Sequence, residues 1–72
     1  MKKIKKIKIK INGKKKAVNH QSSLHDLIYN QKIPIKKVAI ELNKEIVDKK
    51  KVKKIKLNTN DVIEVVHFIG GG

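Results

Sequence analysis

The sequence predicts an α+β fold, in which a mixed sheet of four to five strands packs on one helix in the order ββαβββ. Three observations predict it: an Ile-Lys alternation that ends at Asn12-Gly13, a short apolar stripe behind two serines, and a series of later strand-like segments that ends in residues 62–68. A helix laid across a small sheet buries the apolar sides of both elements. With 72 residues and no internal repeat, the chain is expected to form one domain, 1–72.

The chain opens with a predicted β-hairpin. Residues 7–11 read Ile-Lys-Ile-Lys-Ile, and this alternation places the three isoleucines on one face of a half-buried strand. Asn12-Gly13 follows directly, and this pair tolerates the positive φ angles of a two-residue type I′ turn. We therefore expect a second, antiparallel strand over about residues 15–19, with Ala17 near its centre.

A helix is predicted from about Ser23 to Gln31, where apolar residues recur at i, i+3 and i+4. Ser23 can cap the first turn, and Asp26 suits both the capping-box position and the positive end of the helix. Pro34 cannot extend the helix. Because a helix of about two turns is too short to persist alone, it must pack on the sheet.

The second half of the chain supplies the remaining strands. Residues 38–42 alternate in polarity, and Asn43-Lys44 can turn the chain into a short strand over 45–47. The Lys-rich stretch 48–56 has weak periodicity, so we expect irregular structure with room for one helical turn.

The last strand is expected to be central in the sheet. A turn cluster, residues 58–61, precedes it. Residues 62–68 are almost continuously apolar, which indicates a strand that is covered on both faces or flanked by neighbours.

Composition excludes several classes of protein. There is no cysteine, which excludes disulfides, thiolate metal sites and a cysteine nucleophile. No apolar run is long enough to span a membrane, and the basic start of the chain lacks the apolar core of an export signal, so the cytoplasm is the expected compartment.

The net charge of +13 can indicate nucleic-acid binding. All 19 basic residues are lysine, whereas arginine is the residue suited to bidentate phosphate and guanine contacts. Only two aromatic residues are available for base stacking, and the lysines are spread through the chain. A composition rich in Lys, Ile and Asn explains the charge as a solvated surface, and nucleic acid is not the expected partner.

The chain ends in Ile69-Gly70-Gly71-Gly72. One interpretation is a frayed end, because glycine adds no packing and chain ends are often disordered. The other is a delivery arm: a backbone without Cβ atoms can enter a narrow channel, and four extended residues reach roughly 14 Å. On the second interpretation, residues 1–68 form the folded body and 69–72 a flexible arm that carries the Gly72 carboxylate.

A terminal carboxylate reacts only after one oxygen becomes a good leaving group. A mixed anhydride with AMP supplies that group, and a sulfur nucleophile can displace AMP to leave a terminal thiocarboxylate. Its sulfur can then attack a carbonyl or imine carbon, and the arm raises its effective concentration in a partner's site.

The sequence resembles the ThiS family, the sulfur carrier proteins of the thiamine pathway, which have the ubiquitin-like β-grasp fold. Four segments in order carry the resemblance: residues 9–13, 24–28, 38–47 and 61–72. The family's terminal glycines map onto Gly71 and Gly72, and Gly70 extends the run. The family commonly has proline where Asp48 stands, and a more mixed segment with an aromatic residue in place of 49–56. These departures affect the expected path of the chain after the fourth strand and any partner contacts there. They do not affect the tail.

The resemblance implies a carrier that is not itself an enzyme and binds no cofactor. It implies three partners: an E1-like adenylyltransferase that uses ATP to activate Gly72, a cysteine-derived persulfide donor, and thiazole synthase as the acceptor. Glycyl adenylate and C-terminal 1-thioglycine would be the transient forms of Gly72. Three alternatives remain: a molybdopterin-type sulfur carrier, a ubiquitin-like protein modifier, and a basic nucleic-acid-binding module.

The other candidate residues suggest weaker hypotheses. His20 and His25 lie five residues apart across the start of the helix, a poor spacing for ligands on one face, so no metal site is expected. His67 is expected on the surface, with a proton-donor role near the tail as the alternative. Phe68 and Ile69 are interpreted either as core residues or as an apolar patch that docks on partners.

Overall fold

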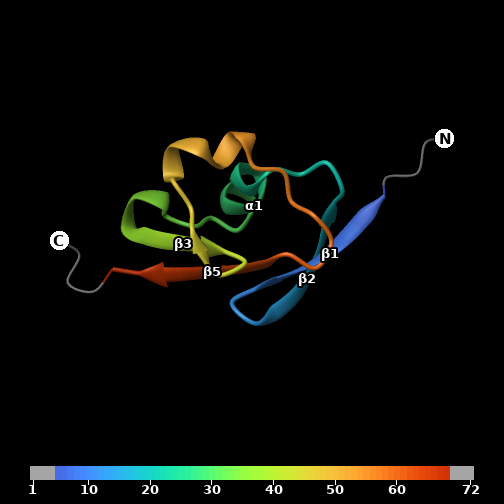
Figure 1. The fold of residues 1–72 in the computed structure, drawn as a ribbon, viewed down its shortest axis with the longest axis horizontal. Helices are drawn as coiled ribbons and strands as arrows, with labels where there is room; N and C mark the ends of the chain where they lie inside the picture. Colours follow the sequence, from blue (N-terminus) through green and yellow to red (C-terminus); the bar gives the residue numbers. More distant parts are fainter. Residues whose placement is uncertain (1–4, 69–72) are drawn as a thin grey trace.

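The computed structural model describes residues 5–68, which form a five-stranded mixed sheet crossed by one α-helix (Figure 1). The strands lie in the order β2-β1-β5-β3-β4. The elements are β1 (Lys6–Ile11), β2 (Lys14–Asn19), α1 (Leu24–Asn30), the 3₁₀ helix η1 (Ile35–Lys37), β3 (Val38–Leu42), β4 (Glu45–Ile46), the 3₁₀ helix η2 (Lys49–Lys54) and β5 (Val62–His67). The α+β class and the ββαβββ order are confirmed, and the arrangement is that of a ubiquitin-like β-grasp.

The predicted hairpin forms with the predicted turn. β1 and β2 pair antiparallel, and β2 begins one residue earlier than expected, at Lys14. Asn12 and Gly13 have φ angles of 50° and 81°, the positive values that a type I′ turn requires. The side chain of Asn12 also accepts a hydrogen bond from the backbone N–H of Val65 at 2.8 Å, which ties this turn to β5.

The α-helix is fixed at its start by the predicted capping box. Ser23 Oγ accepts from the N–H of Asp26 at 3.1 Å, and Asp26 Oδ2 accepts from the N–H of Ser23 at 2.9 Å. The expected ends of the helix, Ser23 and Gln31, are its capping residues, so the helix proper is one residue shorter at each end. The helix residues that face the sheet are the three apolar ones: Leu24, Leu27 and Ile28.

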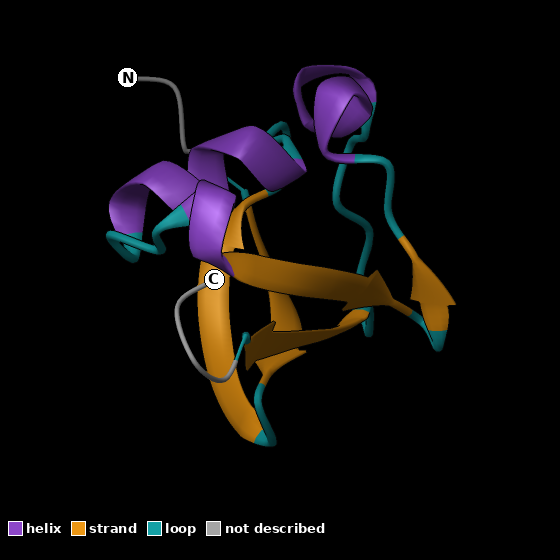
Figure 2. Ribbon diagram, turned by 90° about the vertical axis from the view of Figure 1, so that its left-hand side faces the viewer, coloured by secondary structure: helices purple, strands orange, loops and turns teal. Residues whose placement is uncertain are grey.

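β5 is central, as predicted, because it pairs parallel with β1 and antiparallel with β3. It is not covered on both faces. Ile63 is fully buried under the helix layer, whereas Val66 on the opposite face is 56% exposed. Figure 2 shows the helices gathered on one side of the sheet, so the outward side chains of β5 face solvent.

The Lys-rich stretch is more regular than predicted, because η2 runs for six residues where one helical turn was expected. Asp48 caps it by accepting a hydrogen bond from the N–H of Lys50 at 2.9 Å. Val52 is 4% exposed and joins the core, which anchors the segment beside the start of α1. The core residues are Ile9, Leu24, Leu27, Ile28, Val38, Ile40, Val52, Leu57 and Ile63.

Within residues 5–68, no helix is long and apolar enough to cross a bilayer.

Candidate functional site

The predicted reactive group is the carboxylate of Gly72, and it lies outside the described residues together with the rest of the arm, 69–72. The structure does describe the base of that arm. Phe68 is the last described residue, and it directly follows β5.

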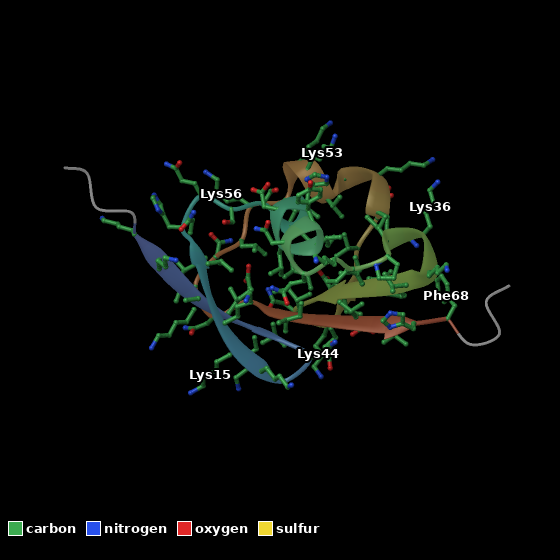
Figure 3. All side chains as sticks on the ribbon, turned by 180° about the vertical axis from the view of Figure 1, so that it is seen from behind. Lys15, Lys36, Lys44, Lys53, Lys56 and Phe68 are labelled. Atoms are coloured by element: carbon green, nitrogen blue, oxygen red, sulfur yellow. The ribbon has the colours of Figure 1, made fainter. Side chains whose placement is uncertain are left out.

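The base of the arm is hydrogen-bonded to the beginning of β3. His67 is the register partner of Val38, and the N–H of Phe68 donates to the carbonyl of Lys37 at 3.0 Å. The backbone is therefore held to the segment before β3 up to the residue that precedes Ile69. In Figure 3, Phe68 stands at the end of β5 beside the segment that leads into β3.

A lysine that the sequence analysis did not single out contacts this base. Lys49 Nζ donates to the carbonyls of Ile35 at 2.9 Å and Val38 at 2.7 Å, and it lies 5.3 Å from the centroid of the Phe68 ring. Its half-buried side chain is thus placed between backbone carbonyls and an aromatic face, both of which attract a cation. Nothing in the sequence pattern distinguishes Lys49 from its lysine neighbours, because these contacts come from residues distant in the chain.

Two exposed apolar side chains lie at the same end of β5: Phe68 is 54% exposed and Val66 is 56% exposed. Ile46 on β4 is 78% exposed, but it pairs with Glu41, whose partner on β5 is Glu64, so it lies further from this end. Val66 pairs with Ala39 of β3, and its side chain faces away from the core. Phe68 is accessible to a partner, as the docking hypothesis requires, and Ile69 lies outside the described residues.

The histidines are dispersed. His20 and His67 are exposed, His20 Nδ1 lies 3.3 Å from the carbonyl of Lys5, and the ring of His25 stacks on Tyr29 with centroids 6.5 Å apart. Among residues 5–68, no group of three or more His, Cys, Asp or Glu side chains is placed to hold a metal ion.

The side chains of Asp26 and Asp61 have structural contacts. The hydrogen bond from the Ser23 backbone N–H lowers the pKa of the Asp26 carboxyl. Asp61, 8% exposed, accepts from Asn43 Nδ2 at 3.0 Å and from the N–H of Asn58 at 2.7 Å. These carboxylates cap a helix and join loops.

The lysines project from many elements. Those labelled in Figure 3 (Lys15, Lys36, Lys44, Lys53 and Lys56) stand on different parts of the surface. One ion pair joins Lys44 to Glu64 at 4.0 Å, between side chains that are 83% and 43% exposed. Such an exposed pair adds little stability.

Comparison with known proteins agrees with this geometry. The ThiS family model matches residues 9–72. The chain is 38% identical over 65 residues to a protein of Bacillus subtilis (strain 168) named sulfur carrier protein ThiS. The match covers 89% of this chain and 98% of that protein. It is 35% identical over 66 residues to a thiazole synthase of Paramagnetospirillum magneticum (strain ATCC 700264 / AMB-1), and the match covers 92% of this chain but only 20% of that protein.

A solved structure shares the fold. The crystal structure of a thiamine biosynthesis protein (ThiS) from Geobacter metallireducens superposes with a TM-score of 0.80 at 25% sequence identity, covering 92% of this chain and all of that chain. The family match, the match to the near full-length relative and the structural match all cover the same part of the sequence. The chain therefore belongs to the ThiS family.

Proposed function

We propose that this chain is a sulfur carrier of thiamine thiazole synthesis and that the carboxylate of Gly72 carries the sulfur. The observation that supports it best is the family match, which extends from residue 9 in β1 through β5 to residue 72. The central strand β5 leads straight into the arm, and hydrogen bonds hold the chain up to Phe68. A fixed base followed by three glycines is suited to delivering a carboxylate into another protein's site.

The chemistry begins with activation by a partner. An E1-like adenylyltransferase would bring ATP to Gly72, whose carboxylate oxygen attacks the α-phosphorus, so that pyrophosphate leaves and an acyl adenylate forms. A persulfide sulfur then attacks the acyl carbon and AMP leaves. A thiol that cleaves the resulting acyl disulfide releases the thiocarboxylate and is itself oxidised to a disulfide.

In this scheme the chain is a substrate and carrier, not an enzyme. The bonds that form and break are at Gly72, while the groups that activate the carboxylate belong to the partner enzymes. The folded body supplies recognition and holds the base of the arm. All of these partners act in the cytoplasm in this proposal.

Thiazole synthase is the proposed acceptor of the sulfur. A segment similar to this chain makes up a fifth of the thiazole synthase of P. magneticum. Joining a carrier to its acceptor in one chain raises the effective concentration of the reacting group, which is an advantage only for domains that act together. This supports the thiamine pathway over the molybdopterin-type alternative.

Intact-protein mass spectrometry tests the proposal. The chain is incubated with the cognate adenylyltransferase, ATP and a persulfide source, and we expect a mass increase equal to the difference between one sulfur and one oxygen atom. The matched control is the same chain with Gly72 amidated, which should gain nothing. An unchanged mass for the free acid, or a mature protein that continues beyond Gly72, would contradict the proposal.

A further inference from the structure

Lys49 has contacts that set it apart among the lysines of residues 5–68. It is the one lysine in this range whose ammonium donates to backbone carbonyls, those of Ile35 and Val38. It is also the one that lies over an aromatic ring, that of Phe68. An exposed lysine would keep its ammonium hydrated, whereas this side chain is half-buried and ordered by several groups at once.

The same short segment holds both Lys49 and Phe68. The carbonyls of Ile35 and Val38 bind the Lys49 ammonium, and the carbonyl between them, that of Lys37, accepts the hydrogen bond from the N–H of Phe68. Phe68 is therefore fixed through its backbone by this segment and through its ring by Lys49. The aromatic face and the ammonium attract each other because the ring quadrupole is negative above its plane.

Side chains can orient the base of the arm, whereas the glycines of the arm have none. Beyond Ile69 the sequence has only glycine, which has no side chain to pack and no strong preference among backbone angles. What side chains can fix is therefore the point at which the chain leaves β5. Holding Phe68 to the folded body shortens the length of chain that samples positions around this point, which raises the effective concentration of the Gly72 carboxylate in a partner's site.

We propose that Lys49 is a positioning residue of the carrier: by holding the ring of Phe68, it fixes the base from which the arm presents the Gly72 carboxylate to the adenylyltransferase. The inference rests on the proposed function and deepens it. It assigns the ammonium of Lys49 a role in arm delivery that a solvated lysine would not have.

The first test compares Lys49→Met with wild type and with Lys50→Met, which removes the charge of an exposed neighbour in the same helix. Adenylation is followed by release of pyrophosphate at varied carrier concentration. Because misplacement of a reacting group slows the reaction more than it weakens docking, Lys49→Met should lower kcat about tenfold and change KM less than about twofold. Lys50→Met should behave as wild type.

A double-mutant cycle with Phe68→Leu tests whether Lys49 acts through the ring. Leucine keeps the backbone N–H and an apolar side chain but offers no aromatic face. If the ring transmits the effect, Lys49→Met should change kcat less than about twofold in the Phe68→Leu background. In NMR spectra, the Lys49 Hε protons should show an upfield ring-current shift in wild type that is lost in Phe68→Leu.

The outcomes separate the two proposals. If the wild-type chain is not adenylated at all, the proposed function is wrong and the positioning role falls with it. If wild type is adenylated and Lys49→Met reacts at the wild-type kcat, only the positioning role is wrong. An equal loss of kcat in both backgrounds, or an unshifted Lys49 Hε signal in wild type, would also overturn it.

Discussion

Asn43 Nδ2 donates a hydrogen bond to Asp61 Oδ1 at 3.0 Å, so the turn after β3 is joined to the loop that leads into β5. The other amide atom of Asn43, Oδ1, accepts from the N–H of Val62 at 2.9 Å. The second carboxylate oxygen of Asp61 accepts from the N–H of Asn58 at 2.7 Å. This network fixes the start of the central strand, whose other end carries the arm.

Asp61→Ala should therefore destabilise the fold. The change removes two acceptor oxygens at a site that is 8% exposed and deprives the Asn58 N–H and the Asn43 amide of their partner. We expect a loss of about 2 kcal/mol in the free energy of unfolding, measured by urea denaturation. The control is Glu64→Ala, which breaks the exposed pair with Lys44 and should cost roughly 0.5 kcal/mol or less. Equal losses for the two variants would contradict the assignment.

Asp26→Asn should make stability less dependent on pH in the acid range. The Ser23 backbone N–H stabilises the ionised carboxylate and lowers the pKa of Asp26 below its usual value in the folded chain. A carboxyl whose pKa is lower in the folded chain than in the unfolded chain stabilises the fold at pH values above its unfolded pKa. This stabilisation is lost as the pH falls through its folded pKa. The variant should thus be less stable than wild type at neutral pH, and the two should converge on acidification. Unfolding midpoints measured across the acid range check this, and a constant difference would refute it.

Local signals made much of the fold predictable. The alternation in 7–11, the Asn12-Gly13 turn and the capping box of Ser23 and Asp26 each depend on neighbours within four residues, and each forms as expected. The chemistry at Gly72 was inferred from the glycine-rich end because it depends on the absence of side chains there, and it stays a prediction, since 69–72 lie outside the described residues.

Long-range contacts account for what was missed. Six residues of η2 are regular because Val52 packs in the core and Asp48 caps the start. In the sequence, the run of lysines gives no sign of either contact. The contacts of Lys49 join residues 11 and 14 positions apart, which no periodic pattern records. The apolarity of β5 was expected to mean either cover on both faces or flanking strands, and the second holds, because apolarity alone does not say which faces a single helix can cover.

Deleting Gly71 and Gly72 should abolish adenylation and leave the fold unchanged. Terminal glycines add no side-chain packing, so the thermal unfolding midpoint should equal that of the full chain. The same variant tests the nucleic-acid alternative, in which lysines neutralise phosphates and affinity falls steeply with salt. Any DNA binding, measured by fluorescence anisotropy at two salt concentrations, should be the same with and without the two glycines. A truncated chain that is still adenylated would refute the role of the arm.

Val66→Ser should weaken docking to the adenylyltransferase. A partner that receives the arm must approach the end of β5, where Val66 and Phe68 are both more than half exposed. The residues whose truncation costs more than about 1 kcal/mol cluster at the centre of an interface, and we expect Val66 to be one of them, so KM should rise about five- to tenfold while kcat stays near wild type. The matched control is Tyr29→Ser, which removes a 76% exposed aromatic side chain from α1. Because Tyr29 is carried by α1 and not by the strand that leads into the arm, its variant should keep the wild-type KM, and an equal rise for both variants would place docking elsewhere.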